Sequence, residues 1–210
     1  MNSTSHPKSI PEIVQTGYPT LHNPSESVDL TKLDSPEIKK VLQDMTLALE
    51  SQDDGVGLAA PQIGIPLRIF MVAGFIYDRI EYAALRRKAK HDGTELPDVK
   101  TLKKNPHQFF INPVITKESK EKKWMDGEGC LSVRWLYGKV YRSTRVTLEA
   151  YDEKGNFVRK GASGILAHIF QHEVDHLNGI LFTDKAKDIQ AYDPEEIKKE
   201  IADRKDSHEL

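Results

Sequence analysis

The motif HEVDH, residues 172–176, constrains the fold of this 210-residue chain more than any other feature. It lies in "SGILAHIFQHEVDHLNG", whose apolar residues recur at helical spacing and predict a helix from an N-cap at Ser163 to a left-handed glycine at Gly179. The expected core residues of this helix are Ile165, Leu166, Ile169, Phe170, Val174 and Leu177. Two histidines one turn apart share a face, and a buried His-Glu pair needs a partner. We therefore expect a fold that closes around a metal ion held by His172 and His176, with Glu173 beside a water on that ion.

A catalytic site of this kind needs a third protein ligand and an open position for water. The metzincin pattern would place a histidine where this chain has Phe182, whose phenyl ring cannot bind a metal. The gluzincin pattern allows Glu196, although that residue lies in the acidic stretch "DPEEIKKE". Upstream, the one cysteine of the chain, Cys130, lies in "DGEGCLS", and a thiolate is a soft ligand for Zn or Fe(II). A lone cysteine is more often a buried structural residue. Glu196 and Cys130 both remain candidates on these grounds.

Composition limits the classes of partner. The formal net charge is -2, which gives no reason to expect DNA binding. No apolar run approaches the ~18 residues of a membrane helix, so we expect no membrane partner. One cysteine excludes an intramolecular disulfide and fits a reducing compartment, and the first residues lack the apolar segment of a signal peptide. The expected location is therefore cytoplasmic.

The remaining chain predicts alternating helices and strands within one domain, residues 1–210. A helix follows a cap at Asp34 or Ser35 and ends near Gly55. The expected strands are 67–75, 109–116 (broken by Pro113), 139–152 and 156–162, the last two around the turn "DEKGN". An insertion, 76–108, is expected to form a helix over 77–90 and a polar loop. A polar C-terminal helix is expected over 193–210, with Ile197 and Ile201 as its anchors.

Three blocks resemble the signature motifs of peptide deformylases, in the order of that family. They are "GVGLAAPQ" (55–62), "EGCLS" (128–132) and "QHEVDH" (171–176). The resemblance covers roughly residues 10–190. It implies an α+β fold, in which antiparallel sheets pack around a central helix that carries the metal ligands. It also implies an activity, the hydrolytic removal of the formyl group from the N-terminal formyl-methionine of newly synthesised polypeptides.

The resemblance assigns a role to each matching position. Cys130, His172 and His176 match the ligands of one divalent metal ion, usually Fe(II), with Zn, Ni or Co as substitutes. Glu173 matches the catalytic carboxylate. Gln62 and the backbone N–H of Leu131 match the groups that polarise the formyl oxygen. Glu128 and Arg142 match an acid–base pair that braces the cysteine loop in the family.

The resemblance also indicates a substrate cleft. Val56 and Gly57 match a stretch whose backbone pairs with the peptide like an added strand. Gly129 permits close approach of a backbone. The methionine side chain needs an apolar pocket, for which we expect Ile165, Ile169 and neighbours. His168 departs from the apolar residue usual in the family and is expected in the pocket wall or rim. Arg134 and Trp135 depart from the usual Pro-Gly turn after the cysteine block and would change the rim of the cleft.

The expected partners are nascent formylated peptides. The insertion 76–108 holds eight Lys or Arg and five Asp or Glu, a local charge of +3, which suggests a further hypothesis of docking to the ribosome. An inactive, deformylase-like binding protein is the alternative from another class. The presence of every matching catalytic and ligand residue favours the enzyme.

Overall fold

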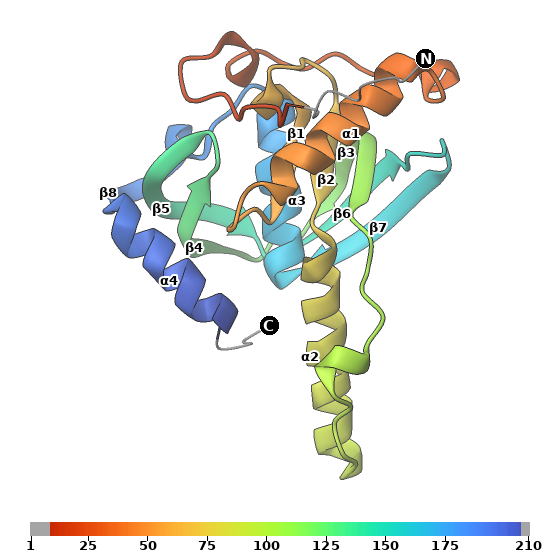
Figure 1. The fold of residues 1–210 in the computed structure, drawn as a ribbon, viewed down its shortest axis with the longest axis vertical. Helices are drawn as coiled ribbons and strands as arrows, with labels where there is room; N and C mark the ends of the chain where they lie inside the picture. The colour runs from red at the N-terminus through yellow and green to blue at the C-terminus, as the bar shows by residue number, and fades with distance from the viewer. Residues whose placement is uncertain (1–8, 207–210) are drawn as a thin grey trace, which may run out of the picture.

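Two antiparallel sheets surround one helix in this computed structural model, which describes residues 9–206 (Figure 1). The larger sheet has the strand order β1-β2-β3-β6-β7, and the smaller has the order β4-β5-β8. The strands are β1 (Gly57–Ala59), β2 (Ile69–Val72), β3 (Gln108–Glu118), β4 (Lys122–Cys130), β5 (Val133–Ser143), β6 (Arg145–Tyr151), β7 (Phe157–Ser163) and β8 (Lys187–Ala191). The α-helices are α1 (Pro36–Glu50), α2 (Gly74–Asp92), α3 (Gly164–Leu177) and α4 (Pro194–Asp206). Short 3-10 helices are η1 (Pro19–Leu21), η2 (Leu30–Lys32), η3 (Ala60–Ile63), η4 (Val99–Thr101) and η5 (Phe182–Asp184). The predicted α+β class is confirmed.

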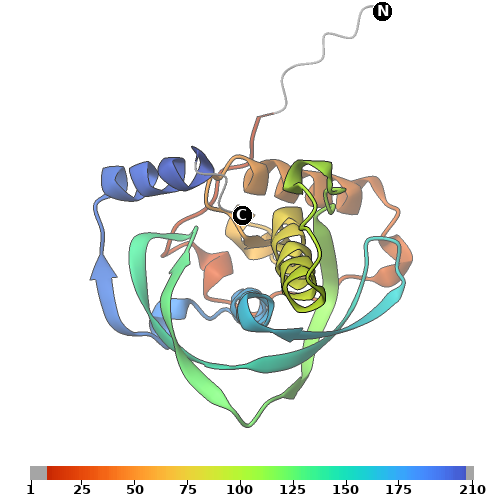
Figure 2. The same cartoon turned by 90° about the horizontal axis from the view of Figure 1, so that it is seen from below.

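Helix α3 lies inside the curve of the strands, where Figure 2 shows it end-on. Three aromatic rings join it to the larger sheet: Phe170 of α3 meets Phe110 of β3 edge-on at 5.1 Å, and Phe110 stacks on Phe70 of β2 at 4.8 Å. All three are buried. Aromatic pairs of this kind contribute about 0.5–1.5 kcal/mol beyond the area they bury. The helix that carries HEVDH is therefore fixed by the main core.

The ends of α3 agree with the sequence, but one of its expected core residues does not. Ser163 is the N-cap, and Gly179 has a φ of +71°. A Cβ on Gly179 would lie 2.8 Å from the backbone of Asn23, so the close approach also requires glycine here. Ile165 was expected in the core and is 49% exposed, because it lies in the first turn of α3, at the cleft described below.

The strand predicted over 67–75 ends earlier, at Val72, and the chain turns at once into α2. This helix is longer than the expected 77–90 and projects from the body of the molecule (Figure 1). Gly74 permits the turn, since a Cβ there would lie 2.0 Å from the carbonyl oxygen of Asn105. The Gly74 N–H donates to His107 Nδ1 at 3.1 Å, which joins the two ends of the projecting segment. Residues 74–107, called the arm below, therefore leave and rejoin the body at one place.

Strand β3 runs through Pro113, where a break was expected. The chain absorbs the proline with a register shift between Ile111 and Val114, and Asn112 takes a positive φ of 51°. The Asn112 side chain exchanges two hydrogen bonds of 2.8 Å with the backbone of Val28, which holds this bulge.

The C-terminal part forms β8 and then α4, which is the polar helix expected over 193–210. Residues 207–210 of this expected helix lie outside the described part. The Tyr192 N–H donates to the carbonyl of Trp135 at 2.9 Å, and the Asp193 side chain accepts from the Glu195 N–H at 2.7 Å at the start of α4. In the described residues, no helix is long and apolar enough to cross a membrane.

Candidate metal centre

A cleft opens where the edges of the two sheets meet. Strand β1 is the edge of the larger sheet and β4 the edge of the smaller, and residues from both line a cavity of about 600 Å³ together with α3. An unpaired sheet edge offers backbone N–H and C=O groups to an extended chain. The cleft can therefore accept a peptide along β1 or β4.

Cys130, at the end of β4, and the two histidines of α3 converge in this cleft. Their candidate ligand atoms all lie within 4.8 Å of one another, and Cys130 Sγ is 3.2 Å from His176 Nε2. The rings of His172 and His176 lie nearly perpendicular, with centroids 4.9 Å apart. One sulfur and two nitrogens at these separations fit around a single ion with bonds of about 2.0–2.3 Å. Glu196 is exposed on α4 and is not part of this group among the described residues.

The charge state of the cluster favours a cation. Burial raises the pKa of the Cys130 thiol, but the charge of His176 and hydrogen bonds from both histidines outweigh it and lower the pKa to about 5. The Ser132 N–H also donates to the sulfur at 3.4 Å. Burial lowers the pKa of His172, but hydrogen bonds with Cys130 and Glu128 raise it well above its usual value, so without metal the thiolate faces a protonated imidazole. A divalent cation that binds here displaces the imidazole proton.

Glu173 lies beside the cluster, and one of its two carboxylate oxygens is left without a hydrogen bond. Its side chain is 3% exposed, and Oε2 finds no hydrogen bond among the described residues. A Cβ on Gly57 would lie 2.6 Å from Glu173 Oε1, so only glycine leaves room for this oxygen. Burial raises the pKa of Glu173 to about 7, against the charges of His172 and His176. A buried carboxylate with a free oxygen and this pKa is suited to accept and return a proton.

Gln62 reaches the same point from the other side. It belongs to η3, directly after β1, and its Oε1 accepts the Ala59 N–H at 2.8 Å. That bond turns Nε2 toward the cluster, 3.5 Å from Cys130 Sγ and 3.3 Å from Ser132 Oγ. Leu131, next to the cysteine, also lines the cleft. The structure therefore places Gln62 next to the cluster and Leu131 in the lining of the same cleft.

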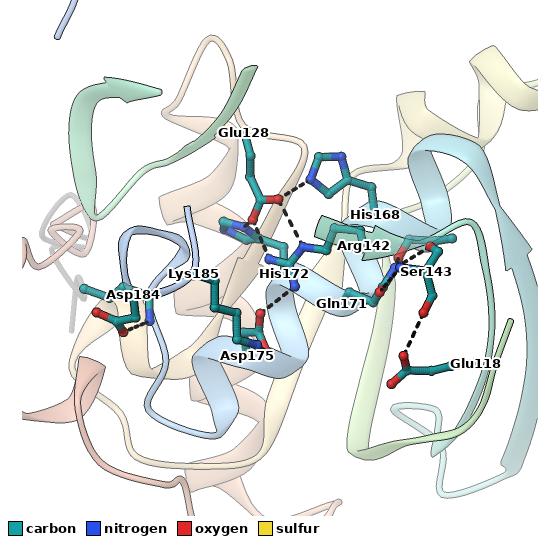
Figure 3. A network of polar contacts seen from close by, with 12 residues as sticks. Glu118, Glu128, Arg142, Ser143, His168, Gln171, His172, Asp175, Asp184 and Lys185 are labelled. Atoms are coloured by element: carbon teal, nitrogen blue, oxygen red, sulfur yellow. Dashed lines mark hydrogen bonds and ion pairs between the residues drawn. The ribbon is translucent and has the colours of Figure 1, made fainter. Parts of the chain in front are cut away.

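A polar network holds the cluster from behind (Figure 3). Glu128 accepts from His172 Nδ1 at 2.7 Å, and Arg142 donates to both Glu128 oxygens at 2.5 and 3.1 Å. Arg142 also donates to Asp175 at 2.6 Å, and Asp175 accepts from Lys185 at 2.6 Å. Burial raises the pKa of Glu128, but its hydrogen bonds lower it far more, so the carboxylate stays charged. Because Glu128 occupies Nδ1, the Nε2 of His172 is the atom that would bind an ion.

His168 has a contact that the sequence did not reveal. It lines the cleft, as expected, but its Nε2 also lies 2.5 Å from Glu128 Oε2. Glu128 therefore contacts both His168, in the wall of the cleft, and the candidate ligand His172. The only sequence signal is that His168 lies one helical turn before His172, on the same face.

The other expected substrate residues also reach the cleft: its lining includes Val56, Gly57, Gly129, Ile165 and Ile169. Sequence reasoning missed several lining residues, which are Asp54, Gly127, Tyr137, Tyr192, Ile197, Glu200 and Ile201. Arg134 donates a hydrogen bond of 2.6 Å to Asp54, which lines the cleft. Its guanidinium also lies 5.0 Å from the ring centroid of Trp135.

Comparisons with known proteins agree with one another. A family model described as polypeptide deformylase matches residues 10–192. A peptide deformylase 1A of Arabidopsis thaliana, chloroplastic/mitochondrial, is 39% identical over 84% of this chain and 61% of its own length. A peptide deformylase of Christiangramia forsetii is 34% identical over 85% of this chain and 82% of its own. The Met-Ala-Ser-bound structure of an Acinetobacter baumannii peptide deformylase superimposes with a TM-score of 0.66 at 28% identity, over 84% of this chain and 98% of its own. This chain spans about three fifths of the length of the plant relatives it matches.

Proposed function

The chain belongs to the polypeptide deformylase family, and from this premise we propose that it hydrolyses the formyl group from the N-terminal formyl-methionine of new polypeptides. The observation that carries the proposal is the cluster of Cys130, His172 and His176, beside which the buried Glu173 Oε2 has no hydrogen-bond partner among the described residues. A ligand group, a proton acceptor and two candidate oxyanion donors meet in one cleft between sheet edges.

Cys130, His172 and His176 would hold one divalent ion, for which we propose Fe(II), with Zn, Ni or Co as substitutes. One thiolate and two neutral imidazoles leave a divalent ion with a net positive charge, which lowers the pKa of a bound water to about 7 in zinc sites. The orphaned Glu173 oxygen and the soft, converging donor atoms support this assignment.

Glu173 would move the proton. It takes a proton from the attacking water as the new C–O bond forms at the formyl carbon. It then gives the proton to the departing amine nitrogen as the C–N bond breaks, which releases formate and a free N-terminus. A pKa near 7 suits both directions of transfer near neutral pH.

Gln62 and Leu131 would stabilise the oxygen that becomes negative during the attack. The Gln62 amide is held in place by Ala59, so it needs no reorganisation when charge develops. The Leu131 N–H is the second proposed donor. Loss of one such donor typically raises the barrier by about 2.7–4 kcal/mol.

The substrate would lie along the sheet edges, with Val56, Gly57 and Gly129 facing its backbone. The methionine side chain would rest against Ile165, His168 and Ile169 of α3. A Met-Ala-Ser peptide bound to the Acinetobacter baumannii relative supports a substrate that begins with methionine. Pairing with a peptide backbone tolerates many sequences after the first residue.

Formate release from formyl-Met-Ala tests the proposal most directly, with metal analysis of protein purified without oxygen. Oxygen is excluded because a thiolate of low pKa is prone to oxidation. We expect formate release that requires about one metal ion per chain. Replacement Cys130→Ser should remove metal and activity together. Full activity of the serine variant, or metal-loaded protein without formate release, would contradict the proposal.

We also propose that the arm docks this enzyme to the ribosome, in the cytoplasmic compartment where formylated chains are made. The arm projects from the body (Figure 1), and it carries eight Lys or Arg and five Asp or Glu, a local charge of +3. Co-sedimentation with ribosomes tests this: the full chain should pellet, and a chain with a shortened arm should not. Equal pelleting by both proteins would end the idea.

A further inference from the structure

The cleft extends past the ligand cluster to the C-terminal segment. Helix α4 is polar, and its only large apolar residues in the described part are Ile197 and Ile201. Both line the cleft, together with Glu200 between them. Positions 197, 200 and 201 follow the spacing of one helix face. The apolar face of α4 is thus turned toward the same cavity that holds Cys130 and the histidines.

Strand β8 fixes α4 in this place. Ala191 pairs with Leu136 of β5, and the ring of Tyr192 packs edge-on against Tyr137 with centroids 5.4 Å apart. Tyr137 and Tyr192 line the cleft as well, so the aromatic pair continues the wall from β5 to α4. Figure 1 shows α4 beside β8, next to the smaller sheet.

Three residues of this wall are only partly covered by the described part of the chain. Tyr192 is 42% exposed, and Ile197 and Ile201 are only partly buried. Covering apolar side chains at a cavity with an apolar ligand is favourable, because it removes their surface from water. The methionine is already assigned to Ile165 and Ile169 of α3. The α4 wall is therefore available to a later part of the same ligand.

We propose that Ile197, Ile201 and Tyr192 form a subsite for an apolar side chain that follows the formyl-methionine of the peptide. This inference rests on the proposed function. A peptide is the expected occupant because one cavity contains both the ligand cluster and the α4 wall. A peptide with its formyl group at the cluster can therefore extend along this cavity past α4. These residues contact substrate only beyond the reacting group, so they determine specificity through KM.

The test compares two peptides, formyl-Met-Leu-Leu and formyl-Met-Ala-Ala. The native protein should prefer the leucine peptide by about tenfold in kcat/KM, in the range of small apolar contacts in enzyme pockets. The double variant Ile197→Ala, Ile201→Ala should lose that preference through a higher KM on the leucine peptide alone. Lys199→Ala, on the opposite face of α4, is the matched control and should keep the preference.

The outcomes separate the two proposals. No formate from either peptide with native, metal-loaded protein overturns the proposed function, and the subsite falls with it. Normal turnover without a leucine preference, or an equal loss on both peptides in the double variant, overturns the subsite alone.

A second variant, Ile201→Glu, places a charge in the wall and should shift preference from formyl-Met-Leu-Leu toward formyl-Met-Lys-Lys. An unchanged order of preference in this variant also overturns the subsite.

Discussion

Helices α3 and α4 both contribute to the cleft, but they are held in different ways. Helix α3 is buried by aromatic packing, and its polar residues are tied to Glu128 and Arg142 by short hydrogen bonds. Helix α4 is mostly exposed and is fixed mainly through β8 and Tyr192. The proposed chemistry thus rests on the rigid helix and the proposed selectivity on the loosely attached one. The latter can change its side chains with little effect on the fold.

The largest expected effect comes from α3, in the replacement Glu173→Gln. The amide keeps the size of the side chain but cannot take a proton, so kcat/KM on formyl-Met-Ala should fall by about 10²–10⁴-fold. Formate release measures the rate, and metal analysis should show unchanged metal content. Glu153→Gln, in the exposed turn before β7, is the control. A Glu173→Gln protein at full rate would remove Glu173 from the mechanism.

The replacement Arg142→Ala tests the rigidity of the α3 side. It leaves the buried carboxylates of Glu128 and Asp175 without their guanidinium, which should cost about 3–5 kcal/mol of unfolding free energy. Urea unfolding gives the value. Arg145→Ala removes an exposed arginine from the same region, whose ion pair to Glu121 spans 3.8 Å, and should cost less than about 1 kcal/mol. Similar losses in both variants would mean that the network does not stabilise α3.

A smaller effect is expected from His168→Leu, which removes one donor to Glu128 and leaves the rest of the network. The support of His172 weakens, so metal affinity should fall by roughly 10–100-fold, the usual effect of losing a group that orients a ligand. Competition with a chelator measures this affinity. His91→Leu, exposed on α2, should bind metal normally. Unchanged affinity in His168→Leu would limit His168 to the cleft wall.

The smallest effect is expected on the α4 side. Ile197→Ala should change the unfolding free energy by about 0.5 kcal/mol or less, as at surface positions. Ile169→Ala in α3, which empties a buried site, should cost about 2–5 kcal/mol in the same urea titration. If the two variants were equally destabilised, α4 would belong to the core and the contrast between the helices would fail.

The sequence predicted those parts of the fold whose periodicity is strong. Helices α1 and α3 and the β6–β7 hairpin follow from apolar spacing and turn residues. Strand β4 was missed because "KKWMDGEGC" has no regular alternation, and the structure shows a register shift between Met125 and Glu128. Strand β8 is short and exposed, so it has no apolar pattern to detect.

The site was predictable where residues act at fixed local spacing, as His172 and His176 do. Cys130 needed the family resemblance, because a lone cysteine has no spacing of its own. The His168–Glu128 contact joins positions 40 residues apart, and no local pattern encodes such a pair. The sequence also did not predict that Ile197 lines the cleft, because the orientation of α4 depends on how β8 pairs with β5.

The two ends of the arm are joined by hydrogen bonds at its base. Gly74 and His107 meet by a hydrogen bond, and Asp78 accepts from the Asn105 N–H at 2.7 Å just beyond it. These hydrogen bonds, together with Ile76 and Tyr77 of α2, which are buried in the main core, anchor the arm to the body. Insertions or deletions in the arm beyond these contacts should leave β2, β3 and the candidate metal ligands where they are. The outer part of the arm can therefore change in length or sequence while the cleft keeps its structure.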